Sequence, residues 1–165
     1  MKVTIKNKLT TALISSKGAE LTSLKDSNNR EFIWQGNPEF WAKHSPILFP
    51  IVGTLKNNHF SYNGLEYNLS RHGFARDQNF ELIEKTDNQA IFSLKANSES
   101  KKMYPFNFEL QLSYTLEEKK LILSYKIINN DKVTIPFSIG AHPAFALPEA
   151  FENYSLRFEK NEELL

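Results

Sequence analysis

The sequence predicts an all-β protein built as a sandwich or a barrel. Two long stretches alternate apolar and polar residues, and an Asn-Gly pair separates two shorter alternating runs. Helical signals are confined to single turns, so strands must form the core. A chain of 165 residues indicates one domain, residues 1–165, because domains usually hold about 100–200 residues.

The clearest period of two covers residues 110–116 and 121–127. Leu, Tyr and Ile occupy every second position there, and a polar turn at 117–120 separates the two stretches. This pattern predicts an antiparallel hairpin with one buried face. Ile122 and Ile128 indicate that the second face of the later strand is also partly covered.

Two more hairpins are expected. Asn63-Gly64 lies between alternating runs, and this pair suits the two positive φ values of a type I′ turn. A polar turn at 86–89 links candidate strands at 80–84 and 90–94. Further strands are expected at 2–6, 10–15, 19–25, 31–34, 133–140 and 153–159.

Helical signals are short. Asn37-Pro38 is typical of an N-cap followed by proline at the first helical position, which predicts one turn through Trp41. A second single turn is expected over 146–151, and the charged residues 99–102 are interpreted as a solvated loop.

Composition narrows the classes of function. The absence of cysteine excludes a disulfide scaffold and a thiolate metal site, and it fits a reducing cytoplasm. A net charge of +1 argues against binding to nucleic acid and against a polybasic membrane anchor. No apolar segment is typical of a signal peptide or a membrane span. We therefore expect a soluble cytoplasmic protein with no membrane or nucleic-acid partner.

His72 lies in a chemically dense segment. Residues 71–77, Arg-His-Gly-Phe-Ala-Arg-Asp, follow a predicted strand, and loops at strand ends often carry binding residues. The alternative is a plain turn in which Arg76 and Asp77 pair in solvent and Gly73 permits the bend.

His142 lies in a second such segment, residues 139–145, Ile-Gly-Ala-His-Pro-Ala-Phe. Gly140 lets the backbone approach another group closely, and Pro143 stiffens the chain that follows. Phe145 offers a flat apolar surface. The alternative is a turn that merely ends a strand.

Other chemistries lack their sequence markers. There is no closely spaced pair of metal ligands, no Gly-x-Ser-x-Gly and no glycine-rich phosphate loop. We therefore expect no metal and no cofactor. Two histidines in glycine-bearing turns, among many aromatic residues, suit acid/base chemistry on a neutral polar ligand.

These segments together resemble the aldose 1-epimerase (galactose mutarotase) family, and most of all its LacX-like bacterial branch. The resemblance runs through the whole chain in order. It is carried by residues 18–24, 31–34, 47–53, 63–64, 72–77 and 140–145. It implies a galactose mutarotase-like β-sandwich (supersandwich) of which the chain holds the N-terminal portion, incomplete at the C-terminus.

The resemblance also implies an activity. Such enzymes interconvert the α and β anomers of an aldohexose by opening and closing the sugar ring, without a cofactor. By motif, His142 corresponds to the catalytic acid and His72 to a second histidine that hydrogen-bonds the sugar. Arg76 corresponds to a contact for a sugar hydroxyl or a phosphate, and Asp77 and Phe145 are further candidate substrate contacts.

Two features depart from the family pattern. Thr54 stands where many relatives carry arginine. The catalytic glutamate of the family belongs to a C-terminal half that has no counterpart here, and its loss as general base would cost on the order of 10²–10⁴ in rate. Alternative functions are therefore a non-catalytic carbohydrate-binding sandwich, a hexose-6-phosphate mutarotase and an inactive remnant. The oligomeric state is left open.

Overall fold

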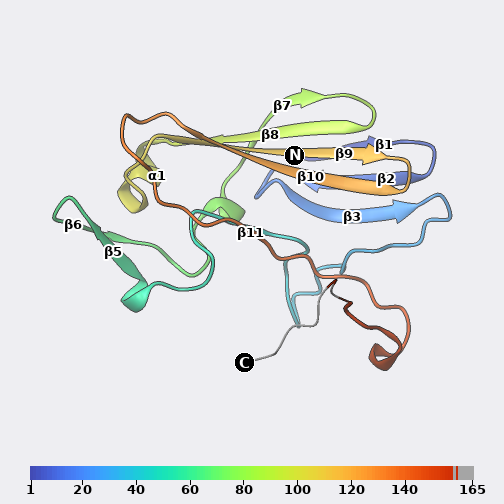
Figure 1. Cartoon of the computed structure of the whole chain (residues 1–165). Helices are drawn as coiled ribbons and strands as arrows, with labels where there is room; N and C mark the ends of the chain where they lie inside the picture. Colours follow the sequence, from blue (N-terminus) through green and yellow to red (C-terminus); the bar gives the residue numbers. More distant parts are fainter. Residues whose placement is uncertain (158, 160–165) are drawn as a thin grey trace.

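The computed structural model describes residues 1–157 and residue 159. Two antiparallel sheets form the body of the molecule, and Figure 1 draws them together in its upper half. The first sheet has the order β1-β2-β3. Its strands are β1 (Lys2–Lys6), β2 (Thr10–Ser15) and β3 (Glu20–Asp26). The second has the order β10-β9-β8-β7. Its strands are β7 (Glu81–Lys85), β8 (Gln89–Lys95), β9 (Phe108–Glu117) and β10 (Lys120–Asn129).

Smaller elements lie below these sheets and beside their left end in Figure 1. A short pair joins β4 to β11, and a separate hairpin joins β5 to β6. The bounds are β4 (Ile47–Leu48), β5 (His59–Tyr62), β6 (Leu65–Asn68) and β11 (Gly140–Ala141). The helical pieces are α1 (Ser98–Met103) and three 3₁₀ turns, η1 (Lys56–Asn58), η2 (Ala75–Asp77) and η3 (Phe151–Asn153).

The core forms where the two sheets face each other. Every second residue of β9 is buried, and Leu110, Leu112 and Tyr114 have no exposed surface. The Tyr114 hydroxyl donates a hydrogen bond of 2.7 Å to the Ala19 carbonyl, which joins β9 to the turn before β3. Removal of this much apolar surface from water is the main stabilising contribution to the fold.

The three predicted hairpins are confirmed. Leu121 pairs with Leu116 across the β9–β10 turn, and β7 pairs with β8. Asn63 and Gly64 have φ values of 50° and 76°, as a type I′ turn requires. The expected strands at 2–6, 10–15 and 19–25 correspond to β1, β2 and β3. The all-β prediction therefore holds.

Three of the expected strands are wrong. Residues 31–34 form only isolated bridges, Lys25 to Glu31 and Ile33 to Phe145. Residues 133–139 follow an irregular path, and only 140 belongs to β11, because Pro136 lacks an amide donor and Ser138 bonds singly to the Pro50 carbonyl. The stretch 153–159 begins inside η3 and forms no strand over 154–157, while residue 158 lies outside the described residues.

The helical predictions were partly wrong. One turn forms at 37–41, where the Trp41 amide donates to the Asn37 carbonyl at 2.8 Å. The turn expected over 146–151 lies later, in η3. The charged residues 99–102 belong to α1 rather than to a loop, because Asn97 and Ser100 form a reciprocal capping box. No described helix is long and apolar enough to cross a membrane.

Candidate active site

His72 is held by a reciprocal pair of hydrogen bonds with Gly53. The His72 amide donates to the Gly53 carbonyl at 2.8 Å, and the Gly53 amide donates to Nδ1 of the His72 ring at 3.0 Å. His72 itself has a φ of 68°, a strained conformation for a residue with a side chain. Strain of this kind persists only where the surroundings impose it, as they often do at functional sites.

The second ring nitrogen of His72 lies 3.2 Å from the Nε of Arg71. A neutral imidazole has only one acceptor nitrogen, so Nδ1 and Nε2 cannot both accept hydrogen bonds. The Gly53 amide is part of the backbone and cannot turn away, whereas the Arg71 side chain is exposed. We therefore assign the proton of the neutral ring to Nε2, which makes that nitrogen a donor toward any ligand.

Gly73 allows this turn to lie against the chain at Phe49. It has a φ of 68°, and a Cβ at this position would overlap the Phe49 carbonyl and lie 2.7 Å from Cδ of Pro50. The same carbonyl accepts from the amides of Phe74 and Ala75 at 3.1 and 3.2 Å. The glycine of the His72 segment is therefore required by a close approach of two backbones.

His142 follows β11 directly. The β11–β4 pairing places Ala141 opposite Ile47, and the His142 amide then donates to the Pro46 carbonyl at 3.1 Å. The exposed ring lies 5.0 Å from the Trp41 ring and 6.3 Å from the ring of His72, measured between centroids. The fold thus brings together two histidines that are far apart in the sequence.

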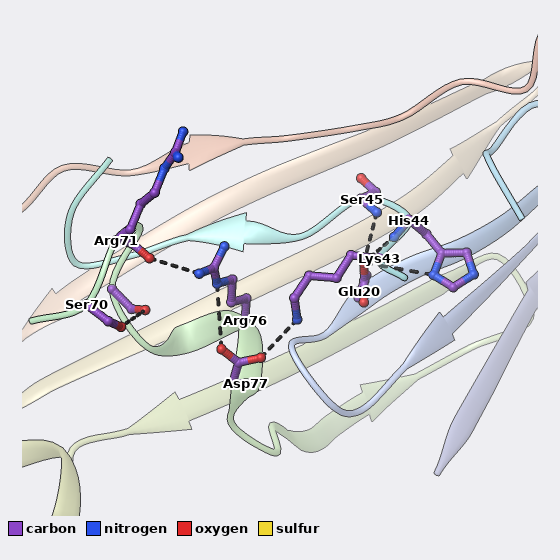
Figure 2. Close-up of polar contacts among 9 residues, drawn as sticks. Glu20, Lys43, His44, Ser45, Ser70, Arg71, Arg76 and Asp77 are labelled. Atoms are coloured by element: carbon purple, nitrogen blue, oxygen red, sulfur yellow. Dashed lines mark hydrogen bonds and ion pairs between the residues drawn. The ribbon is translucent and has the colours of Figure 1, made fainter. Parts of the chain in front are cut away.

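Glu20, at the start of β3, positions the chain beside this pair. Its Oε1 accepts from the amides of His44 and Ser45 at 2.6 and 3.0 Å, as Figure 2 shows. The indole of Trp34 donates to the Trp41 carbonyl at 2.8 Å. These bonds hold Trp41 itself and the chain shortly after it.

Arg76 and Asp77 belong to η2 and are tied to their neighbours. Arg76 donates through Nη2 to the Arg71 carbonyl at 2.9 Å. Asp77 accepts from Lys43 at 2.9 Å, and its other oxygen lies 3.6 Å from Nε of Arg76. Figure 2 shows Lys43 and Arg76 converging on Asp77 from two sides. Arg76 therefore folds back toward the start of the segment that carries His72, and Asp77 partly balances its positive charge.

Phe145 lies in a different place. Its backbone pairs with Ile33, and its side chain, 59% exposed, lines a cavity of about 420 Å³ together with Leu24 and Phe32. The structure thus brings His72, His142 and Arg76 together. Asp77 is held in ion pairs, and Phe145 lines a cavity that the two histidines do not share.

The electrostatic surroundings favour a neutral His72. Partial burial lowers its pKa from the usual 6.5. The positive charges of Arg71 and Arg76, and His142, lower that pKa further. A ring that stays neutral near pH 7 can donate a hydrogen bond to a neutral polar ligand, or accept one from it, without carrying a charge.

Sequence reasoning missed three residues of this site. Trp41, Glu20 and Gly53 were not singled out, although Trp41 packs against the His142 ring, Gly53 bonds to His72, and Glu20 holds the neighbouring chain at 44–45. The predicted turn ending at Trp41 was the one sequence signal that pointed to any of these three residues. Glu20 and Gly53 act through backbone contacts, which residue patterns do not reveal. Among the described residues, no group of three or more His, Asp or Glu side chains could hold a metal ion.

Comparison with known proteins assigns the class. The sequence model of the aldose 1-epimerase family matches residues 1–165, so the chain belongs to the aldose 1-epimerase family. It is 39% identical over 172 residues to the plasmid-encoded protein LacX of Lactococcus lactis subsp. lactis. It is also similar to two solved structures, a galactose mutarotase related enzyme from Lactobacillus acidophilus (43% identity, TM-score 0.89) and a galactose mutarotase-like protein from Lactobacillus casei (36%, 0.87).

These similarities extend over only part of each relative. The LacX match covers 98% of this chain and 58% of LacX. The two structural matches cover 92% of this chain and 51% and 52% of the solved chains. The fold is therefore galactose mutarotase-like, and the chain spans little more than half the length of its relatives.

Proposed function

We propose that the chain carries the acid part of a mutarotase-type site, which interconverts the α and β anomers of an aldohexose. The paired rings of His72 and His142 are the observation that supports this most directly. In this scheme His142 protonates the ring oxygen, a base removes the proton from the C1 hydroxyl, and the ring opens. Rotation about C1–C2 and closure on the other face then invert the anomeric centre.

His72 would hold the sugar while His142 moves the proton. Its Nε2 carries the proton of a neutral ring and points away from the Gly53 amide, so it can donate to a sugar hydroxyl. Trp41, packed 5.0 Å from His142, would provide an apolar surface beside the acid. In the family the base is a glutamate, and we expect it to come from the part of the relatives that this chain does not match.

Polarimetry of freshly dissolved α-galactose or α-glucose tests this function. We expect the chain fused to the remaining part of LacX to speed equilibration, and the unfused chain to be slower by on the order of 10²–10⁴. His142→Gln should remove a comparable factor, and His72→Gln should weaken sugar binding. His59→Gln is the matched control, because His59 lies on β5 near Glu66. Full activity in both site variants would overturn these roles.

Sugar binding without catalysis is the second candidate. The groups that shift the pKa of His72 are all cationic or neutral, and the nearby Asp77 is held in ion pairs. Within the part of the chain that the structure describes, a site of this kind has hydrogen-bond donors and no evident base. Calorimetry that detects hexose binding, together with polarimetry at the buffer rate for the fused chain, would favour this candidate over an enzyme.

A phosphorylated hexose is a variant of the first proposal. Arg71 and Arg76 both lie beside His72, and guanidinium groups suit phosphate. Affinity for glucose 6-phosphate that exceeds affinity for glucose, and that falls with added salt, would support this variant. Equal affinity for both sugars would exclude it.

A further inference from the structure

Strand β10 lies at the edge of its sheet. The strand order is β10-β9-β8-β7, and β10 pairs with β9 along all ten of its residues without a register shift. Among the described residues, no strand pairs with its other edge. Proteins usually shorten, bend or cover an edge of this length, since its free N–H and C=O groups can pair with another chain.

The apolar face of the sheet continues onto this edge. Leu112 and Tyr114 of β9 are fully buried, yet their register partners on β10, Tyr125 and Leu123, are partly exposed. The same is true of Leu121 and Ile127, which pair with buried residues of β9. Neighbouring residues in register share a face, so the hydrophobic face ends at a strand whose apolar side chains are only partly covered by the described residues.

The segment that follows β10 also exposes large apolar side chains. Val133 and Phe137 are 49% and 45% exposed. Contiguous exposed apolar residues on a soluble protein often mark a surface for another polypeptide.

We propose that the free edge of β10 pairs with a β-strand from a polypeptide equivalent to the part of LacX that this chain does not match. The length of LacX supports this occupant. The match takes in 98% of this chain but 58% of LacX, so a large part of LacX is left over that could supply a further strand. Charge supports it over a second copy of the chain. β10 carries Lys120 and Lys126 and no acidic residue, so pairing with itself would gather like charges.

The chemistry of the partner strand follows from β10. One face must carry apolar residues to cover Leu123 and Tyr125, and the other face suits acidic residues that can pair with Lys126. This inference does not depend on the proposed function, because strand pairing is measured without sugar or catalysis.

Amide hydrogen exchange tests the pairing. The chain is measured alone and mixed with the purified unmatched part of LacX. We expect the alternate amides of 120–129 that do not bond to β9 to exchange at least ~10-fold more slowly in the complex. A second version, with the LacX part fused after residue 165 through a flexible linker, gives the same readout where the separate part does not fold.

Two variants on neighbouring residues of β10 provide the control. Leu123→Lys places a charge on the apolar face and should abolish the protection, whereas Ser124→Lys lies on the opposite, exposed face, which suits acidic partner residues, and should retain it. Circular dichroism verifies that both variants keep the sheet. Three results would overturn the proposal: protection that spares β10, protection of β10 by self-association of the chain, and unchanged exchange in both versions.

Discussion

At the scale of single residues, His72 is the most constrained side chain of the candidate site. Its backbone adopts a positive φ, and Gly53 holds both its amide and its ring. Two guanidinium groups lie close enough to disfavour its protonated form. A hydrogen-bonding ring that is fixed in place and kept neutral is suited to orienting a polar ligand.

The lowered pKa of His72 gives the first prediction. Replacing Arg71 with Gln removes one of the charges that disfavour protonation, so the pKa of His72 should rise toward 6.5. Arg30→Gln should leave it unchanged, because Arg30 packs over Phe32 instead. NMR titration of the histidine Cε1 protons measures both. A fall in the pKa, or an equal change in both variants, would contradict this cause.

The same shift makes stability depend on pH. Below pH 6.5 the unfolded chain binds a proton at His72 more readily than the folded chain does, so the free energy of unfolding falls as pH is lowered. The loss is complete once pH drops below the folded pKa. His72→Gln should remove this component, as urea titrations between pH 5 and 8 can show.

Gly73 gives a second residue-scale prediction. Gly73→Ala adds a Cβ that overlaps the Phe49 carbonyl at a φ of 68°, and we expect a loss of about 2–5 kcal/mol in unfolding free energy. Gly64→Ala is the control, since Gly64 also has a positive φ but open space around it. It should cost about 1–2 kcal/mol. Equal losses in urea unfolding would show that the close approach is unimportant.

Among the elements, the sequence predicted correctly those whose structure depends on residues that are close together in the chain. The strict alternation of β9 and β10 and the Asn63-Gly64 turn gave correct hairpins, because each depends on neighbouring residues. The failures at 31–34 and 133–140 have another cause. Those segments hold strand-like residues but pair with other strands only at single positions, and tertiary packing decides that.

The candidate site also has features that the sequence predicted and features that only the folded structure reveals. The glycine-bearing turns around His72 and His142 could be recognised as functional candidates. Their approach to 6.3 Å could not, because it depends on the pairing of β11 with β4 and on the contact of Gly73 with Phe49. α1 was missed since a helix of six residues has too little apolar period to detect.

The link between β3 and the segment at His44 gives an element-scale prediction. Glu20→Ala removes the acceptor for the amides of His44 and Ser45, and we expect a loss of about 1.5–3 kcal/mol in unfolding free energy. Glu20→Gln retains an oxygen at this position and should lose less than half as much. Chemical denaturation compares the two. Identical losses would mean that the charge, not the hydrogen-bond geometry, holds this segment.

At the scale of the whole molecule, the two sheets depend on each other for a core. Alternate residues of β9 are buried against the first sheet, and the sheets are also joined at their ends by backbone bonds, such as the Lys6 amide to the Asp87 carbonyl at 2.6 Å. One polar link inside the core is the bond from Tyr114 to Ala19. Neither sheet alone would keep its apolar face from water.

Tyr114→Phe tests that link. The variant keeps the ring but leaves the buried Ala19 carbonyl without its donor, so we expect a loss of about 1–3 kcal/mol in unfolding free energy. Tyr125→Phe, on the partly exposed β10, should change it by less than about 0.5 kcal/mol. Thermal or urea unfolding provides the comparison. No loss in Tyr114→Phe would mean that water replaces the hydroxyl.

The stretch from residue 46 to residue 53 serves as a common support for both histidines. Pro46 holds the backbone of His142, Gly53 holds His72, and the Phe49 carbonyl holds the turn after His72. The separation of the two rings is therefore set by eight consecutive residues, which include β4, rather than by the two large sheets. Substitutions within this stretch offer a way to change the distance between the two histidine rings, and hence the size of ligand that the proposed site would accept, while the rest of the molecule stays as it is.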